Sequence, residues 1–248
     1  MTQLAWRLWL PALLLALWEI AGRSAWLDPL FFPHPSRVGA AAESLIVSGE
    51  WLRVVFETMT RTMLGFALGS ACGLAAGIAT GLWPAARHSV EWLISALLSS
   101  PKITLLPLLI LALGVGEFPK VLLVAIAAFV VVALQTADAV RQVPVSLVEL
   151  GRNYGARGPS MLRWIYLPAV LPSVLSAMRI ALGRALGVAV SVELVTGSSG
   201  LGHMIWRGWQ AFATERVYVG VLTTALLGAS LHFCATLVER RLVAWRRH

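Results

Sequence analysis

The segment MLGFALGSACGLAAGIATGLW, residues 63–83, carries a glycine at every fourth position. Residues four apart lie on one face of an α-helix, so the segment predicts a helix with a ridge of small residues along one side. Its other residues are mostly apolar, and its length approaches the ~20 residues that cross a bilayer. Small-residue ridges let a neighbouring backbone approach closely within a membrane. We therefore predict a transmembrane helix packed tightly against another helix.

The whole chain has the composition of a membrane protein. Of its 248 residues, 58% are hydrophobic and 13% are charged, whereas about a quarter of the residues of a soluble domain are charged. About six segments approach the length of a membrane-spanning helix. These candidate spans are residues 6–22, 63–83, 90–113, 118–137, 169–195 and 217–238. We expect an all-α integral membrane protein that forms a single transmembrane domain over residues 1–248.

The first candidate span has an alternative interpretation. Residues 6–22 are short and follow a basic start, as in a cleavable signal peptide. The stretch AGRSA, residues 21–25, places Arg23 where a cleavage site needs small residues. We therefore expect an uncleaved span.

The arginines predict how the chain lies in the membrane, because cytoplasmic loops carry an excess of positive charge. Six spans place both termini on one side. If that side is the cytoplasm, the 138–168 segment and the tail RRLVAWRR, residues 240–247, lie there too. The arginines of the outer segments are partly offset by acidic residues. We expect both termini to be cytoplasmic.

The stretch ELGRNYGARGPSMLRWIYLP, residues 149–168, is unusually polar for its surroundings. A generic solvated loop would explain the charges alone. A short helix with Glu149, a turn at Gly155 and a second helix from about Pro159 would instead form a compact bent element. Proline is tolerated in a first helical turn because its missing N–H has no partner there.

This spacing resembles the EAA loop of ABC-importer permeases, Glu-Ala-Ala-x3-Gly-x9-Ile-x-Leu-Pro. Five positions match, and Leu150 and Gly151 replace the two alanines. In that family the loop is a coupling helix that docks into a groove of the ATP-binding subunit. The resemblance implies that such a subunit is contacted through Glu149, Leu150, Gly151, Gly155, Ala156, Ile165, Leu167 and Pro168.

Other stretches resemble one branch of the type I importer permeases. The residues 101–120 and 193–202 are similar to regions of permeases for nitrate, aliphatic sulfonates and taurine, and PHPS at 33–36 and Arg61-x3-Gly65 also fit. The resemblance covers nearly the whole chain. It implies a homodimer in the bacterial inner membrane, with two ATP-binding subunits, a soluble substrate-binding protein and membrane lipid as partners.

The chain lacks sequence features of an ATPase or a metalloenzyme. A phosphate-binding P-loop needs Gly-x4-Gly-Lys-Ser/Thr, and the only lysines, Lys102 and Lys120, are each followed by an apolar residue. No metal-ligand spacing or nucleophile–base pair is evident, and no basic patch interleaved with aromatics indicates nucleic-acid binding. We expect no enzyme activity, no cofactor and no nucleic-acid partner, with ATP hydrolysis supplied by a separate subunit.

Charged residues inside the candidate spans suggest a translocation path, because a charge at mid-bilayer costs roughly 3 kcal/mol on insertion scales. The path would be lined by Pro101, Lys102, Pro107, Arg179, Arg184 and Glu193. Its cations would favour an anion. The alternative is that both arginines extend to the cytoplasmic edge and that Glu193 caps the outer end of its span. Glu19 is expected to be a structural hydrogen-bonding partner.

The glycine-rich stretch after the fifth candidate span predicts a tight outer turn near the gate. No strand precedes it, so a phosphate-binding loop is excluded. Ser198, Gly200 and Gly202 are assigned to the path on this basis. His203, Trp206 and Trp209 are expected to anchor the chain at the membrane interface.

Together these features predict the permease subunit of an ATP-driven importer for a small solute, an oxyanion such as an aliphatic sulfonate, taurine or nitrate. A self-sufficient secondary transporter is one alternative, but it would need internal repeats with broken spans, and the sequence shows no such symmetry. An integral-membrane enzyme is another, but it would need a polar catalytic cluster. Co-purification of an ATPase distinguishes the importer from both.

Overall fold

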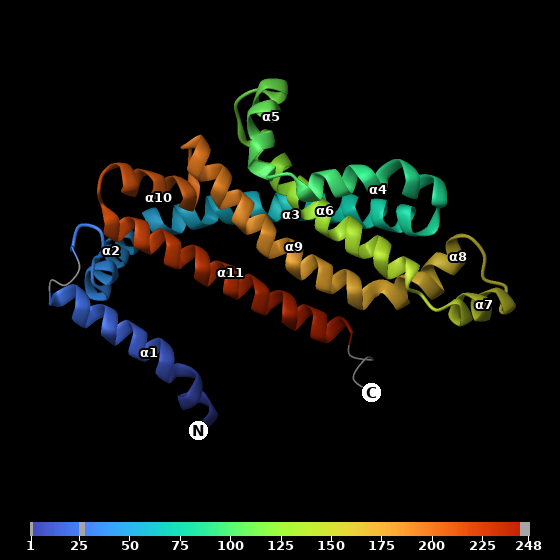
Figure 1. Ribbon diagram of the computed structural model, residues 1–248, viewed down its shortest axis with the longest axis horizontal. Coiled ribbons are helices and arrows are strands. Elements are labelled where there is room, and N and C mark those ends of the chain that lie inside the picture. Colours follow the sequence, from blue (N-terminus) through green and yellow to red (C-terminus); the bar gives the residue numbers. More distant parts are fainter. Residues whose placement is uncertain (1, 25–27, 244–248) are drawn as a thin grey trace. The chain divides into compact units, whose positions relative to one another are not determined.

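A computed structural model describes residues 2–24 and 28–243, without the side chains of residues 2–8 and 11. Within these ranges every regular element is a helix (Figure 1), which confirms the all-α class. The α-helices are α1 Thr2–Arg23, α2 Pro35–Val47, α3 Glu50–Leu82, α4 Pro84–Ser99, α5 Leu106–Leu113, α6 Glu117–Arg141, α7 Val145–Asn153, α8 Pro159–Met161, α9 Leu167–Thr196, α10 Gly200–Gln210 and α11 Thr214–Leu242. A 3-10 helix, η1, spans Lys102–Leu105, and a π-helix, η2, spans Leu162–Tyr166.

The helices divide between two compact units, which are described separately below. The first unit contains the described residues up to Thr58 together with Glu193–Leu226. The second contains Met59–Val192 and the described residues from Leu227 onward. The boundary falls within α3, α9 and α11. The expectation of a single domain over residues 1–248 stays a prediction.

Helix α6 is the core of the second unit. Val124, Ala128 and Val130 on this helix are fully buried. They pack against small residues of α9 such as Ala185, and against Ile94 of α4. A helix that is apolar on all sides is normally buried, and α6 is the most buried of the apolar helices.

The glycine ridge of α3 faces α6, as its spacing predicts. A Cβ atom added at Gly65 would lie 2.5 Å from Cγ1 of Val124, and one at Gly77 would lie 2.6 Å from the carbonyl oxygen of Ala133. Atoms this close would force the two helices apart. The glycines therefore let the backbones of α3 and α6 come into direct contact.

Four helices in the described part of the chain are long and apolar enough to cross a membrane: α3, α6, the run Pro159–Thr196 and α11. The helices α4 and α5 add a fifth candidate if they are taken as one bent span. The expected first span, residues 6–22, lies in α1 and is not among these candidates, so it stays a prediction.

The candidate span at residues 90–113 is broken and is not one straight helix. The chain bends by 105° between α4 and the η1–α5 pair. Pro101 lies at this bend and Pro107 lies in the first turn of α5. Proline has no N–H to donate and disfavours helical backbone in the residue before it, so a break at Ser100 follows from the sequence.

The first unit contains the hydrogen-bonding role expected for Glu19. Its carboxylate accepts hydrogen bonds from the backbone N–H of Ser36 at 3.0 Å and from the Ser36 hydroxyl at 2.7 Å. These contacts join α1 to the first turn of α2. The expectation of a structural role is confirmed.

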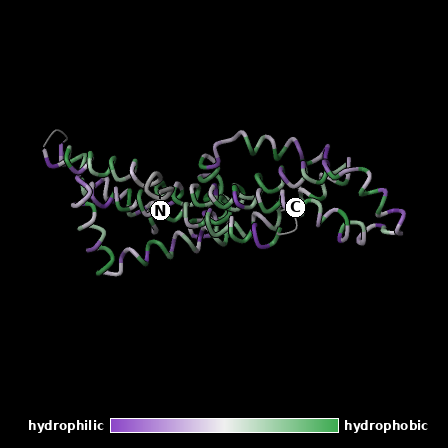
Figure 2. Tube along the Cα trace, turned by 90° about the horizontal axis from the view of Figure 1, so that it is seen from below, coloured by the Kyte–Doolittle hydropathy of each residue, from purple (hydrophilic) through white to green (hydrophobic). Residues whose placement is uncertain are grey.

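Many apolar side chains lie on the surface of the helices. Figure 2 shows hydrophobic residues spread along the chain, and only 6% of the apolar stretch of α11 is buried. Such faces suit contact with lipid or another protein. At the end of α11, Arg240 and Arg241 are exposed. Arg246 and Arg247, which also supported the predicted orientation, lie outside the described residues.

Candidate functional site

The 138–168 segment contains the bent element that the sequence predicts. Helix α7 carries Glu149 and ends in a turn at Gly155, whose φ is +78°. The N–H of Ala156 donates to the carbonyl of Gly151 and the N–H of Gly155 donates to that of Arg152, both at 2.9 Å. This pair of bonds is a Schellman motif, which places a left-handed residue at the position of Gly155. Glycine adopts that conformation without steric cost.

The glycine that replaces the second alanine of the motif allows α7 to pack closely against the following helix. A Cβ atom added at Gly151 would lie 2.8 Å from Cγ1 of Ile165 and 3.1 Å from the sulfur of Met161. Gly151 and Ile165 are fourteen residues apart in the chain. Their contact therefore fixes the angle between α7 and the helical segment that follows it. Figure 1 shows α7 and α8 side by side.

The outer face of this element is largely apolar and exposed. Leu150, Tyr154 and Trp164 are 50%, 86% and 69% exposed. They line a cavity of about 430 Å³ together with Gly155, Ala156 and other predicted coupling residues. Glu149 is exposed beside it. Large exposed apolar patches on a rigid element are typical of protein interaction sites.

The second helix of the element continues into the membrane-spanning α9. Leu167 and Pro168 are exposed and form the start of α9. Pro168 cannot donate a hydrogen bond to the carbonyl of Trp164, four residues earlier. The π-helix η2 lies at this point, as expected where the regular hydrogen-bond ladder is interrupted.

Lys102, assigned by sequence to the translocation path, lies at the break after α4. Its ammonium donates to the carbonyl of Leu98 at 2.8 Å. In a continuous helix that carbonyl would accept from the backbone N–H of Lys102. The side chain replaces the lost backbone bond and caps α4, because the helix ends before Pro101.

Lys102 and Arg184, two predicted path residues, line the same cavity of about 250 Å³. Leu98 of α4, Gly187 and Val188 of α9 and apolar residues of α6 complete its wall, which contains no carboxylate. Arg184 is exposed. Two cations therefore face a small space that has no acidic residue in its lining.

Arg179 is part of an ion pair rather than a free cation. Its guanidinium lies 2.9 Å from the carboxylate of Glu239 on α11. The hydroxyl of Ser176 donates to the same carboxylate at 2.9 Å. These contacts join α9 to α11, and Arg179 does not line the cavity that Lys102 and Arg184 share.

Glu193 is fully buried and holds the first turn of α10. Its carboxylate accepts hydrogen bonds from the Gly202 N–H and from the Thr58 hydroxyl, each at 2.9 Å. Thr58 in turn accepts from the Leu201 N–H at 2.9 Å. Glu193 thus caps the first turn of α10, whose first N–H groups have no partner within the helix, whereas the capping alternative placed it at the outer end of its own span.

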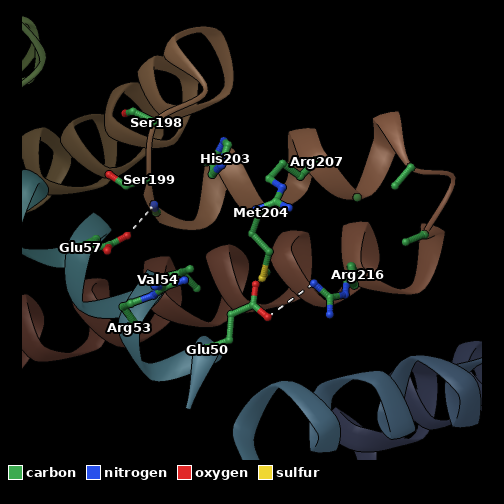
Figure 3. A pocket seen from close by; sticks show the side chains of 14 residues that line it. Glu50, Arg53, Val54, Glu57, Ser198, Ser199, His203, Met204, Arg207 and Arg216 are labelled. Carbon is green, nitrogen blue, oxygen red and sulfur yellow. Dashed lines mark hydrogen bonds and ion pairs between the residues drawn. The ribbon is translucent and has the colours of Figure 1, made fainter. Parts of the chain in front are cut away.

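The glycine-rich turn before α10 is needed for this close contact. Gly200 has a φ of +91°, and a Cβ atom added there would overlap the carboxylate of Glu193. The Gly200 N–H donates to Glu57 at 2.8 Å. Ser198 and Gly200 also line a cavity in the first unit (Figure 3), whereas Gly202 is buried and is not part of its lining.

His203 lies in the same cavity wall. Burial lowers the pKa of its imidazole from the ordinary value, and the nearby charge of Arg207 lowers it further, against the opposing effect of Glu57. The Nδ1 atom of His203 is buried and has no hydrogen-bond partner in the part of the chain that the structure describes. The interfacial role predicted for this residue stays a prediction.

A buried charge cluster between α3 and α6 was missed by the sequence analysis. Arg61 donates to Glu117 at 2.6 and 2.9 Å, and the Lys120 ammonium donates to the same carboxylate at 2.7 Å. Arg61 and Lys120 are buried, whereas Glu117 is 59% exposed. The only sequence signal was the i, i+3 spacing of Glu117 and Lys120 at the start of an apolar run.

Comparison with known proteins identifies the family. Residues 69–244 match the family described as "Binding-protein-dependent transport system inner membrane component". A protein of Escherichia coli strain K12 named as an aliphatic sulfonates transport permease protein, SsuC, is 30% identical over 95% of this chain and 90% of its own length. A riboflavin transport system permease protein, RibX, of Chloroflexus aurantiacus is 31% identical over 94% of this chain and 87% of its own.

The fold matches a known transporter structure. A chain of the inward-facing MetNI methionine ABC transporter superposes with a TM-score of 0.69 at 21% identity, covering 76% of this chain and 94% of that chain. The family match covers more than half of the described chain, and the helices follow the type I importer architecture. The chain therefore belongs to the inner membrane components of binding-protein-dependent transport systems, the permeases of ABC importers, whose ATPase activity resides in separate subunits.

Proposed function

We propose that this permease forms the membrane pathway for a small oxyanion of the aliphatic sulfonate class. Two copies pair to enclose the pathway, and both termini lie in the cytoplasm. One ATP-binding subunit docks against the 138–168 segment of each copy, and a soluble binding protein delivers the cargo from outside.

The exposed apolar face of the 138–168 segment is the observation that carries the coupling role. Leu150, Tyr154 and Trp164 present apolar surface around a cavity, on an element made rigid by the Gly155 turn and the Gly151–Ile165 contact. A rigid, exposed apolar surface suits a partner that must push or pull on the helix behind it. Because this element continues directly into α9, its displacement would be transmitted to a membrane-spanning helix.

The charge of the cavity shared by Lys102 and Arg184 supports an anionic cargo. Its lining contains two cations and no carboxylate, and unscreened charge acts strongly in a low-dielectric setting. The relative named as a sulfonates permease supports the same class. The relative named as a riboflavin permease makes riboflavin the cargo to compare.

Two substitutions in the 138–168 segment test the coupling role. Glu149→Lys reverses a charge at the exposed face, and Gly155→Trp places a bulky side chain where φ is +78°. Both should abolish uptake and retention of the ATP-binding subunit while the permease still inserts in the membrane. Glu43→Lys, on the exposed face of α2, is the matched control for the charge reversal.

Uptake is measured in proteoliposomes with the matched binding protein, for an aliphatic sulfonate and for riboflavin at equal permease abundance. Normal uptake and normal ATPase retention in both variants would contradict the coupling role. Uptake of riboflavin but not of sulfonate would leave the coupling role standing and overturn the cargo.

A further inference from the structure

A cavity of about 410 Å³ lies in the first unit, between the start of α3, helix α10 and the start of α11. It is distinct from the coupling element and from the cavity beside Lys102. Figure 3 shows side chains from all three helices around it. The residues that matter for its chemistry are Arg53, Glu57, Ser199, His203, Arg207 and Arg216. Its volume is within the range that holds a small molecule.

The acidic residues of this cavity already have partners. Glu57 accepts a hydrogen bond from the Gly200 N–H at 2.8 Å, and Glu50 lies 3.5 Å from Arg216. Within the described residues, Arg53 and Arg207 have neither an ion pair nor a hydrogen bond from their guanidinium groups. The cavity therefore has two guanidinium groups that form no ion pair with a carboxylate among the described residues, although Glu57 also lines it.

The cavity wall also has a hydrogen-bonding group that no other described residue contacts through a hydrogen bond. Nδ1 of His203 is buried and has no hydrogen-bond partner among residues 2–24 and 28–243. Buried polar atoms without partners are rare in folded proteins, so this nitrogen is a candidate contact for a bound group. The ring of His203 lies between the α10 arginine and the Ser198–Ser199 turn (Figure 3).

We propose that this cavity binds a small oxyanion, a sulfonate, sulfate or phosphate group held by Arg53 and Arg207. Guanidinium groups bind such oxyanions with two parallel hydrogen bonds. His203 supplies a further polar contact to the bound group. That the bound oxyanion is a sulfonate rests on the proposed function. That the cavity binds an oxyanion does not depend on it.

The test uses purified full-length permease in nanodiscs of phosphatidylcholine and radiolabelled inorganic sulfate, with bound sulfate measured by equilibrium dialysis. The double variant Arg53→Gln/Arg207→Gln should weaken binding by about tenfold or more, since loss of a charge-assisted contact costs at least about 1.4 kcal/mol. The control Arg240→Gln/Arg241→Gln removes two exposed positive charges at the end of α11, in the other unit, and should leave binding unchanged.

Circular dichroism and thermal unfolding confirm that each variant is folded. Sulfate binding that is absent in the parent, or equal in parent and double variant, overturns the proposal. Methanesulfonate that displaces the labelled sulfate supports a sulfonate ligand.

A second set of nanodiscs contains phosphatidylglycerol and identifies the source of the oxyanion. If this lipid blocks sulfate binding in the parent, the site exists and its ligand is a lipid phosphate. If it does not, the ligand is a soluble oxyanion. The Glu149→Lys variant should bind sulfate normally even though it loses the ATP-binding subunit, so the two proposals fail independently.

Discussion

The side-chain carboxylate of Glu193 accepts a hydrogen bond from the backbone N–H of Gly202, nine residues later in the chain, at 2.9 Å. The same carboxylate accepts from the Thr58 hydroxyl. One buried side chain at the end of α9 thereby fixes the start of α10 and its position against α3.

Replacing Glu193 by alanine should destabilise the protein by about 2 kcal/mol or more, because a buried N–H of α10 loses its acceptor. Glu193→Gln keeps the length and one acceptor oxygen, so its loss should be smaller. Thermal unfolding of the purified protein in detergent measures both, with Glu43→Gln as an exposed control. Equal stability of the alanine variant and the parent would show that the contact contributes little.

The glycine ridge of α3 was predictable because residues four apart in a helix lie on the same face. The break after α4 could also have been predicted, because Pro101 cannot continue the ladder. The length of the apolar run concealed it, since residues 90–113 satisfy the composition of a single span. Composition measures how apolar a segment is and carries no information on where it bends.

The partners of the charged residues were much less predictable. Arg179 and Glu239 are sixty residues apart, and their ion pair depends on how α9 and α11 pack. The burial of Arg61 depends likewise on the meeting of α3 and α6. A single sequence shows that a charge lies in an apolar run, but its partner is set by tertiary packing.

Substitutions in the ridge test the contact between α3 and α6. Gly69→Ala places a Cβ atom against the backbone carbonyl of Ala125, which cannot rotate away. We expect a loss of about 1–3 kcal/mol, the usual cost of overpacking. Gly39→Ala, on α2, meets no atom within 4 Å and should be neutral or stabilising, because alanine favours helix. Chemical denaturation in mild detergent compares the two, and equal effects would contradict the packing.

His203 should make stability depend on pH. Its pKa is lowered in the folded protein, chiefly by burial, so the unfolded chain takes up a proton first as the pH falls. Stability is therefore full above the ordinary histidine pKa of about 6.5 and decreases as the pH drops below it. His203→Gln should remove this part of the decrease.

Melting temperatures of the parent and His203→Gln at about pH 7.5 and about pH 5.5 measure the effect. The other histidines are common to both proteins and cancel in the comparison. Arg53, Arg207 and Glu57 face the same cavity and are likewise present in both proteins. An identical pH dependence in the two proteins would contradict the assignment to His203.

Cysteine labelling tests the proposed orientation. The native residues Cys72 and Cys234 are both exposed and must first be replaced by alanine. In intact cells a membrane-impermeant maleimide should label Ser199→Cys and Glu117→Cys. It should not label Arg157→Cys until the membrane is opened. Labelling of Arg157→Cys from outside would invert the topology and remove the coupling proposal with it.

Lys102 combines a structural contact with a position in the cavity it shares with Arg184, and three substitutions separate the two roles. Lys102→Met removes both the charge and the bond to the Leu98 carbonyl, so it should lower both stability and sulfonate uptake. Lys102→Arg keeps the charge and a donor and should retain most uptake. Lys102→Glu places a carboxylate in a cavity otherwise lined by one cation and apolar residues, and it should reduce uptake most severely.

These variants are compared in proteoliposomes with the matched binding protein, at equal permease abundance and with thermal unfolding measured alongside. If only the hydrogen bond from Lys102 to the Leu98 carbonyl matters, the uptake rate of each variant follows its stability. Lys102→Glu then transports as well as a Lys102→Met variant of the same stability. If charge matters for the cargo, Lys102→Glu falls below Lys102→Met at equal stability, because a like charge repels an anion where solvent screening is weak. Uptake by Lys102→Glu at the parent rate would overturn the anion path and leave the importer assignment unchanged.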